Sequence, residues 1–241
     1  MLLQQVAATT GHPLSGTVPD WMWLLPLLPL LGFVLNGLLA VVSVYRRGPS
    51  DPAAESVHGH GVSHDAVHAD TAHIAAHDTH HHAPPRHKFA GLASIIGPAV
   101  LFAAFGLAVS IFGAMSGANH LEQPYVQRYF TWMPVGDFRI EAAFQLDQLS
   151  MIMVLVITGV GALIHLFSIG YMRDDPGYPR FFAYLNLFVF FMLVLVLGAN
   201  YPVMFVGWEG VGLCSYLLIG FWFSDRANAD AGKKAFIVNR I

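Results

Sequence analysis

Long apolar stretches separated by short polar segments form the dominant pattern along this chain. At about 1.5 Å per residue, a helix needs about 20 residues to cross a hydrocarbon core of about 30 Å. Stretches of that kind predict membrane spans over residues 21–45, 89–115, 149–169, 181–198 and 201–223. A further run at 233–241 predicts the opening turns of a sixth helix. We therefore expect an all-α, polytopic bundle of transmembrane helices.

The segments between the predicted spans differ from one another in composition. Residues 1–20 contain several Gly and Pro residues and are predicted to be a short lead. In the hydrophilic external loop 116–148, residues 137–147 alternate between polar and apolar side chains. Together with residues 129–133 and a turn beginning at Pro134, that alternation predicts a small surface β-hairpin. Asp147 directly precedes the third span and is expected to cap its N-terminus.

Composition supports a membrane protein. The chain has 241 residues, of which 55% are hydrophobic and only 11% charged, whereas soluble domains have about 25% charged residues. A formal net charge of −3 is too small to indicate an acidic or basic partner, and nothing favours nucleic-acid binding. The single cysteine, Cys214, excludes a disulfide framework. No Lys or Arg precedes Arg46, so we expect the first apolar stretch to remain as a transmembrane helix rather than a cleaved signal.

The basic residues predict the orientation of the chain in the membrane. With strict alternation of the spans, one side of the membrane receives Arg46, Arg47, Arg86, Lys88, Arg173, Arg180, Arg226, Lys233 and Lys234. The other side receives only Arg128 and Arg139. Because positively charged loops stay on the cytoplasmic side, the N-terminus is predicted to lie outside and the 46–88 loop in the cytoplasm or its equivalent.

The 46–88 loop holds ten of the thirteen histidines. Asp, Ala, Gly and Pro make up most of the rest, so the segment cannot bury a core and is predicted to be a disordered cytoplasmic linker. Two sets of histidines have i, i+4, i+8 spacing, so a helix would bring each set to one face. They are weak candidate ligands for Zn²⁺ or Ni²⁺: His60, His64, His68, His73, His77 and His81. Gly59, Gly61 and the Pro84–Pro85 pair oppose a continuous helix, and we favour the solvated linker.

Glu209 is the one charged side chain of the fifth span. A carboxylate at that depth costs a few kcal/mol to insert, and such acids usually face the bundle interior and lie on ion paths. Gly212, Tyr216 and Gly220 follow on nearly the same helical stripe, so the acid shares its face with small residues and a phenol. We favour a role in proton handling over a purely structural ion pair. His165, near the end of the third span, is either a proton relay or a helix–helix contact.

These stretches resemble a known family. Residues 205–223 (FVGWEGVGLCSYLLIGFWF) and 234–241 (KAFIVNRI) are similar to the L-type (chain 5-like) antiporter-like membrane subunit of NADH:quinone oxidoreductase, respiratory complex I. Residues 147–172 and 181–201 fit the same subunit. The large subunits of Mrp-type Na⁺/H⁺ antiporters share the glutamate helix and give the alternative family. A third interpretation is a non-pumping membrane scaffold.

The resemblance implies roles for particular residues. Glu209 would lie on the central proton path and pair with a lysine further along the family's chain. Lys234 and, more weakly, Arg240 would line or brace the entrance to that path. Lys234 also has a simpler interpretation, as a lysine at a helix start that extends toward the lipid headgroups. Proton translocation would be coupled to electron transfer that takes place elsewhere in the complex.

The resemblance also implies which partners the chain has. It would bind no cofactor itself, while NADH, FMN, Fe–S clusters and quinone would be bound by partner subunits. The partners would be other membrane subunits, especially a neighbouring antiporter-like subunit, together with membrane lipid. The expected location is the bacterial inner membrane, with the mitochondrial inner membrane as the alternative. Family members lack the His-rich insert. They also continue beyond the position that matches residue 241, so we expect an N-terminal fragment without independent pumping activity.

Overall fold

The structure is a computed structural model that describes residues 12–45, 89–118, 123–136 and 138–240. The described residues contain five helices that are long and apolar enough to cross a membrane, within Val18–Val42, Ala90–Gly117, Gln148–Tyr171, Tyr178–Leu197 and Tyr201–Ile219. They also contain a two-stranded antiparallel sheet. The predicted all-α polytopic bundle with a small hairpin is therefore confirmed. The 46–88 loop and its candidate metal ligands lie outside the described residues.

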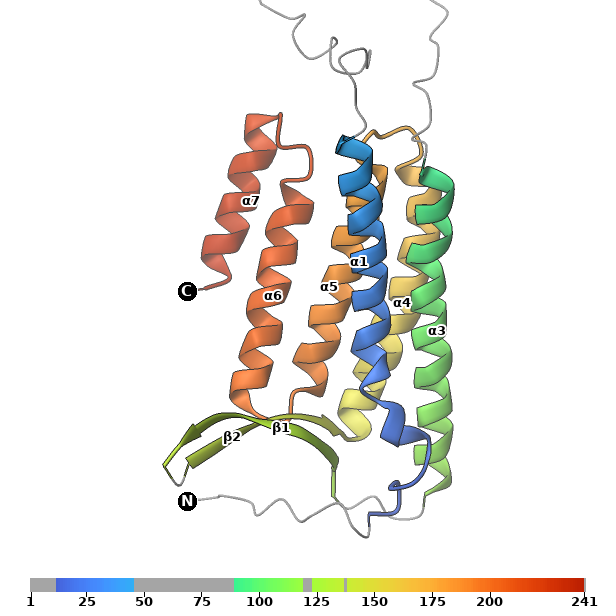
Figure 1. Cartoon of the computed structure of the whole chain (residues 1–241), viewed down its shortest axis with the longest axis vertical. Coiled ribbons are helices and arrows are strands. Elements are labelled where there is room, and N and C mark those ends of the chain that lie inside the picture. Colours follow the sequence, from blue (N-terminus) through green and yellow to red (C-terminus); the bar gives the residue numbers. More distant parts are fainter. Residues whose placement is uncertain (1–11, 46–88, 119–122, 137, 241) are drawn as a thin grey trace, which may run out of the picture.

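The helices form a four-helix bundle with a lateral extension (Figure 1). A short 3₁₀ turn, η1 (Val18–Trp21), leads into α1 (Leu24–Tyr45), which packs with α3 (Ala90–Gly117), α4 (Gln148–Tyr171) and α5 (Tyr178–Leu197). Helix α6 (Tyr201–Ile219) packs on the outer side of α5, and α7 (Arg226–Val238) packs on α6. The strands β1 (Tyr125–Val135) and β2 (Phe138–Leu146) lie across one end of the bundle.

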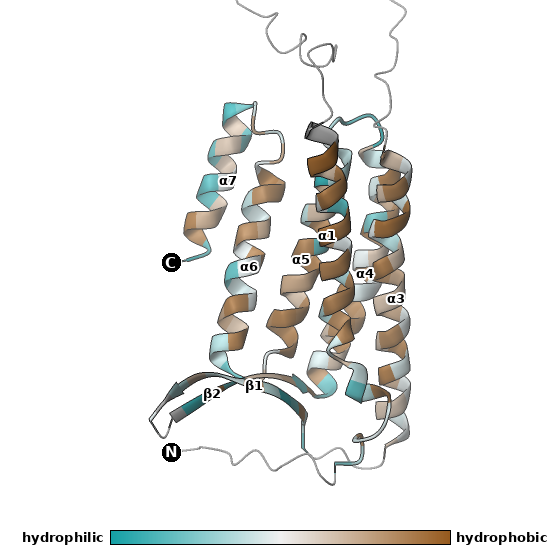
Figure 2. Cartoon of the chain, in the orientation of Figure 1, coloured by the Kyte–Doolittle hydropathy of each residue, from teal (hydrophilic) through white to brown (hydrophobic). Residues whose placement is uncertain are grey.

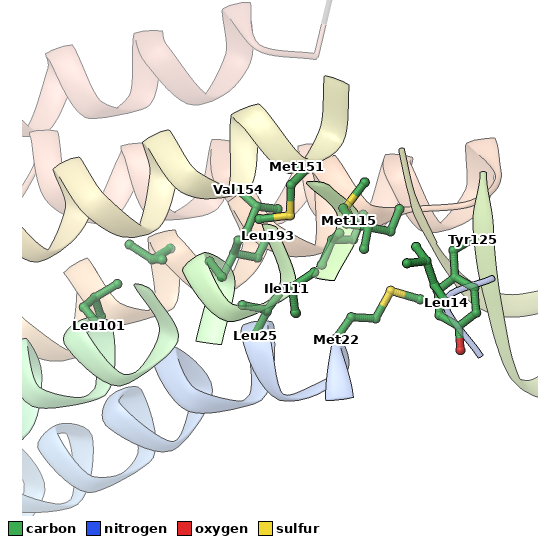
Figure 3. Packing of buried hydrophobic residues seen from close by; sticks show 14 of the residues in the cluster. Leu14, Met22, Leu25, Leu101, Ile111, Met115, Tyr125, Met151, Val154 and Leu193 are labelled. Atoms are coloured by element: carbon green, nitrogen blue, oxygen red, sulfur yellow. The ribbon is translucent and has the colours of Figure 1, made fainter. Parts of the chain in front are cut away.

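The core of the bundle is apolar and comes from all four of its helices (Figure 3). Buried side chains meet there from every helix of the bundle: Leu25, Leu101, Ile111, Met151, Val154 and Leu193. The outward faces of the helices are apolar as well, as Figure 2 shows, and they include exposed side chains such as Ile95, Leu149 and Phe167. In a soluble protein such apolar faces would be exposed to water, whereas in a membrane they would contact lipid tails.

Asp147 caps α4, as the sequence predicted. Its Oδ1 accepts a hydrogen bond from the backbone N–H of Ser150 (2.7 Å), and its own N–H donates to the Ser150 hydroxyl (2.8 Å). This reciprocal capping box satisfies two backbone donors at the helix start. Burial of the Asp147 carboxyl acts to raise its pKa, but the hydrogen bonds from Ser150 outweigh burial and the pKa is lowered.

The hairpin is tied to the junction between α5 and α6. The Asn200 side chain donates from Nδ2 to the Glu141 carbonyl (2.7 Å), while its Oδ1 accepts from the Val203 N–H and caps α6. One residue earlier, the Ala199 N–H donates to the Ala143 carbonyl (3.1 Å). One asparagine therefore starts α6 and anchors β2 at the same time. The first strand is longer than the sequence predicted, since it begins at Tyr125 rather than at residue 129.

The boundaries of the last two helices differ from the prediction. Helix α6 ends at Ile219 rather than at residue 223, and α7 begins at Arg226 in a segment that the sequence had indicated as a loop up to residue 232. The polar composition of 226–232 suggested a loop, but its alanines favour helix. In addition, the Asp225 side chain accepts from the Ala227 N–H (2.9 Å) and caps the helix. Helix α7 is therefore about seven residues longer at its start.

Candidate functional site

Glu209 lies near the middle of α6 and forms an ion pair with Arg240. The distance between Arg240 Nη2 and Glu209 Oε2 is 2.7 Å, and the Glu209 side chain is 27% exposed. The Arg240 guanidinium also stacks over the Phe236 ring, 3.9 Å from its centroid. That stacking fixes the guanidinium plane beside the carboxylate. A carboxylate half-way along a membrane-spanning helix is thus paired with a cation that lies just past the end of α7.

Small residues and aromatic rings bring α6 and α7 together. The ring centroids of Tyr216 and Phe236 lie 5.7 Å apart. Closer to the turn between the helices, a Cβ on Gly232 would lie 3.2 Å from the Tyr216 carbonyl oxygen and 3.3 Å from the Gly220 nitrogen. The stripe that the sequence assigned to the Glu209 face therefore faces α7. Only glycine allows the two backbones to approach so closely without a shift.

Two further contacts hold the C-terminal end of α7 beside Glu209. The Trp208 indole N–H donates to the Asn239 backbone carbonyl (3.1 Å). The Asn239 side chain lies directly against Gly212, at a position that a Cβ would occupy. Trp208 directly precedes Glu209 and Asn239 directly precedes Arg240, so these contacts fix the register in which Arg240 reaches Glu209.

On its opposite side, α6 packs tightly against α5. A Cβ on Gly207 would lie 2.5 Å from the Leu195 backbone nitrogen, and a Cβ on Gly210 would overlap the Phe191 ring. Gly207 precedes Glu209 by two residues, and Gly210 follows it directly. Glu209 is therefore carried on a helix that α5 holds on one side and α7 on the other.

The remaining candidate residues are not at this pair. Lys234 is exposed on α7, and within the described part of the chain no ion pair joins it to Glu209, whereas Lys233 pairs with Asp230 (3.2 Å). The family resemblance ranked Arg240 below Lys234, and the sequence-based prediction began the last helix at residue 233 rather than at Arg226. A start at Arg226 would have predicted that residue 240 comes within about one turn of residue 209 in an antiparallel pair. Trp208 and Asn239 were not singled out, and no local motif marks them.

His165 is fully buried in α4, away from Glu209. Its Nδ1 lies 2.8 Å from the Gly161 carbonyl oxygen, and its ring centroid lies 6.0 Å from that of Phe182 on α5. Helix α5 lies between α4 and α6 (Figure 1). The structure therefore brings Arg240 to Glu209 and does not bring His165 there.

A pocket of about 190 Å³ opens between α5, α6 and the start of α7, lined by Arg180, Tyr184, Tyr216, Leu217, Gly220, Phe221, Phe223 and Ala229. Arg180 donates from Nη2 to the Phe221 carbonyl (3.3 Å) and stacks on the rings of Phe221 and Phe223. This arrangement fixes the turn after α6. Among the described residues, no group of three or more His, Cys, Asp or Glu side chains could hold a metal ion.

Comparisons with known proteins match two parts of the chain. Residues 132–182 match a family model described as NADH-ubiquinone oxidoreductase (complex I), chain 5 N-terminus. Residues 199–241 match a second model, described as NADH:quinone oxidoreductase/Mrp antiporter, TM. The second match contains Glu209, Lys234 and Arg240.

Curated relatives extend these matches. A protein of Mycobacterium tuberculosis named NADH-quinone oxidoreductase subunit L is 51% identical over 147 residues, which cover 61% of this chain and 23% of that protein. Proteins of the same name from Escherichia coli and Pseudomonas aeruginosa are 57% identical over 120 residues and 59% identical over 110 residues. These cover 50% and 46% of this chain, and 20% and 18% of those proteins. The aligned part is thus less than a quarter of the length of each relative.

Proposed function

We propose, from the confirmed resemblance to the L-type antiporter-like membrane subunit of NADH-quinone oxidoreductase, that this chain contributes the N-terminal helices of such a subunit and that Glu209 carries protons in it. The proposal rests on the Glu209–Arg240 ion pair, because Glu209 lies within α6, a helix long and apolar enough to cross a membrane. Intramembrane ion pairs of this kind are costly to maintain and typical of ion paths.

The chemistry of the pair supports proton exchange. An apolar environment favours the neutral, protonated acid, whereas a nearby cation favours the carboxylate. Arg240, 2.7 Å from Glu209, supplies such a cation. If a movement of α7 withdrew Arg240, Glu209 would take up a proton, and the return of Arg240 would release it. Such a switch moves protons without any redox chemistry in this chain.

Other residues have places in this proposal. Lys234 lies on the exposed face of α7, and we assign it to the entrance of the proton path. We place the N-terminus outside a bacterial inner membrane, with the basic loops in the cytoplasm. NADH, FMN, Fe–S clusters and quinone would be bound by other subunits, which would drive this one through conformational change and electrostatics. The membrane partners would include a neighbouring antiporter-like subunit.

An Mrp-type antiporter subunit is the second candidate, because the family model over residues 199–241 is described for both systems. Two observations favour complex I. The model over residues 132–182 is described for complex I alone, and the relatives above are all named NADH-quinone oxidoreductase subunit L.

The test is Glu209→Gln in the complete complex that contains this chain, with NADH oxidation and proton pumping measured on the same membrane vesicles. We expect the number of protons pumped per NADH to fall while NADH oxidation remains measurable. Glu141→Gln is the matched control, because Glu141 lies on the hairpin, paired with Arg128 at 3.0 Å, outside the helices. An unchanged pumping ratio in Glu209→Gln would refute the proton-carrying role. A Na⁺ requirement without NADH dependence would favour the Mrp alternative.

A further inference from the structure

A layer of polar side chains lies inside the four-helix bundle, separate from Glu209. Asn36 on α1, His165 on α4 and Asn186 on α5 are each fully buried, with 0% of their surface exposed. Each belongs to the bundle formed by α1, α3, α4 and α5, and none lies on α6 or α7. Neither lipid nor a partner subunit can therefore reach their polar atoms from outside the bundle.

Several polar atoms of this layer lack partners, unlike the buried hydroxyls of α4. Thr158 donates to the Val154 carbonyl (2.7 Å) and Ser168 to the Ile164 carbonyl (2.8 Å), so their hydroxyls are satisfied within α4. By contrast, four atoms of the layer have no hydrogen-bond partner among the described residues: Asn36 Nδ2, Asn36 Oδ1, His165 Nε2 and Asn186 Oδ1. Buried polar groups without partners are rare in native proteins, and unseen water is a common explanation.

The three side chains converge on one level of the bundle. A Cβ on Gly32 of α1 would lie 2.6 Å from Asn186 Oδ1, so Asn186 lies directly against α1. Asn36 follows Gly32 by one helical turn on the same face. On α5, Asn186 Nδ2 donates to the Phe182 carbonyl (2.8 Å), and the ring of Phe182 lies beside that of His165. Asn36 therefore lies one helical turn along α1 from the contact with Asn186, and Asn186 lies one turn along α5 from the Phe182 ring that contacts His165.

The donor and acceptor pattern of the layer fits water. Since His165 Nδ1 lies at hydrogen-bond distance from a carbonyl oxygen, it carries the hydrogen, and Nε2 is an acceptor. The layer thus offers an amide NH₂ as a donor, two amide oxygens as acceptors and an imidazole nitrogen as a further acceptor. Water both donates and accepts. The three side chains include no carboxylate to balance a bound cation and no permanently charged donor to hold an anion.

We propose that internal water molecules bind in this layer and hydrogen-bond to Asn36, His165 and Asn186, forming a hydrated polar centre within the bundle. Buried water of this kind typically makes about three hydrogen bonds to otherwise unsatisfied groups. The centre links α1, α4 and α5 through solvent instead of direct side-chain contacts. It does not rest on the proton-carrying role of Glu209, because it is formed by other helices.

The test is hydroxyl-radical footprinting by X-ray radiolysis of the full chain in lipid nanodiscs, since radicals form where water is bound. Met151 is the internal control: it is 1% exposed, lies in the dry core cluster and carries a sulfur atom that oxidises readily. We expect His165 and Phe182, corrected for their intrinsic reactivity, to be oxidised at least fivefold faster than Met151. Rates equal to or below that of Met151 would overturn the proposal.

A variant provides the second measurement. Replacing both Asn36 and Asn186 by Leu removes the polar atoms that would hold water between α1 and α5, while keeping similar side-chain volumes. We expect oxidation of His165 and Phe182 to fall at least threefold in Asn36→Leu/Asn186→Leu, with no change in Thr158→Val. Undiminished oxidation in the double variant would contradict water binding by the two amides. If the double variant fails to fold, the comparison with Met151 in the unchanged chain still decides.

Discussion

Arg240, two residues past the end of α7, forms an ion pair with Glu209 on α6, with 2.7 Å between Nη2 and Oε2. The family resemblance directed attention to Lys234 and to a lysine further along the chain, yet the cation beside the carboxylate is an arginine. An arginine stays charged at any physiological pH, so a switch built on this pair would work through the position of the cation rather than through its protonation.

We expect Arg240→Gln to reduce proton pumping by the assembled complex several-fold, because Glu209 then lacks its cation. Arg240→Lys should retain more activity, since it keeps the charge but loses the planar stacking on Phe236. The measurement is the proton-to-NADH ratio in membrane vesicles. Arg139→Gln, on the exposed hairpin, is the control and should pump normally. If the effects of Arg240→Gln and Glu209→Gln simply multiply, the two residues do not act as a pair.

Gly207→Ala should destabilise the chain by about 1–3 kcal/mol, because the new methyl would meet the Leu195 backbone at 2.5 Å and backbone cannot move aside as a flexible side chain does. Gly113→Ala on α3 is the matched control, since nothing lies within 4 Å of the added carbon. The measurement is unfolding of each variant by a denaturing detergent in mixed micelles. Equal stability of the two variants would show that α5 and α6 do not pack as closely as described.

Asp147→Ala should cost about 0.5–2 kcal/mol of stability through loss of the N-cap of α4. Asp147→Asn keeps a side-chain oxygen for the Ser150 N–H and should retain most of that stability. The folded-state pKa of Asp147 is lowered from its ordinary value of 3.8. Its stabilising contribution is therefore complete above about pH 4 and is lost as the pH falls through the lowered pKa. Unfolding measured from pH 7 down to pH 2 should show a smaller acid loss in Asp147→Asn than in the unchanged chain.

Asn200→Ala should loosen the hairpin, because it removes both the hydrogen bond to the Glu141 carbonyl and the cap on α6. We expect hydrogen exchange of the β2 amides to accelerate by about tenfold, which corresponds to the loss of about 1.4 kcal/mol of local stability. Asn200→Asp tests the two roles separately, because it keeps the cap acceptor and removes the donor to Glu141. Exchange as slow as in the unchanged chain would mean that the hairpin does not depend on this tether.

Much of the architecture could be predicted from hydropathy, because a membrane span needs about 20 consecutive apolar residues and leaves few alternatives. The alternating residues before Asp147 likewise predicted the hairpin, and the position of Asp147 predicted its cap. The start of α7 was wrong, because hydropathy does not report helix formation in a polar segment. Alanines and the Asp225 cap decide it instead.

The site was predictable only in part. A lone acid in an apolar helix predicted Glu209 as a site residue, but its partner depends on which face of the next helix turns toward it. That depends on the close approach at Gly220 and Gly232 and on the contact between Asn239 and Gly212, which no sequence pattern specifies. The missing partners of Asn36 and Asn186 were also invisible in the sequence, because a buried asparagine looks the same whether or not its hydrogen bonds are made.

The attachment of the hairpin has a consequence for how the protein is made. Its strands are synthesised before α4 and α5, yet they bind residues 198–200, which emerge only after both helices. The hairpin therefore cannot make these contacts until both helices have been synthesised. The hairpin can dock on residues 198–200 only when α4 and α5 have the correct topology. Docking of the hairpin thus requires α4 and α5 to cross the membrane in opposite directions, because only then do residues 198–200 return to the side on which the hairpin lies.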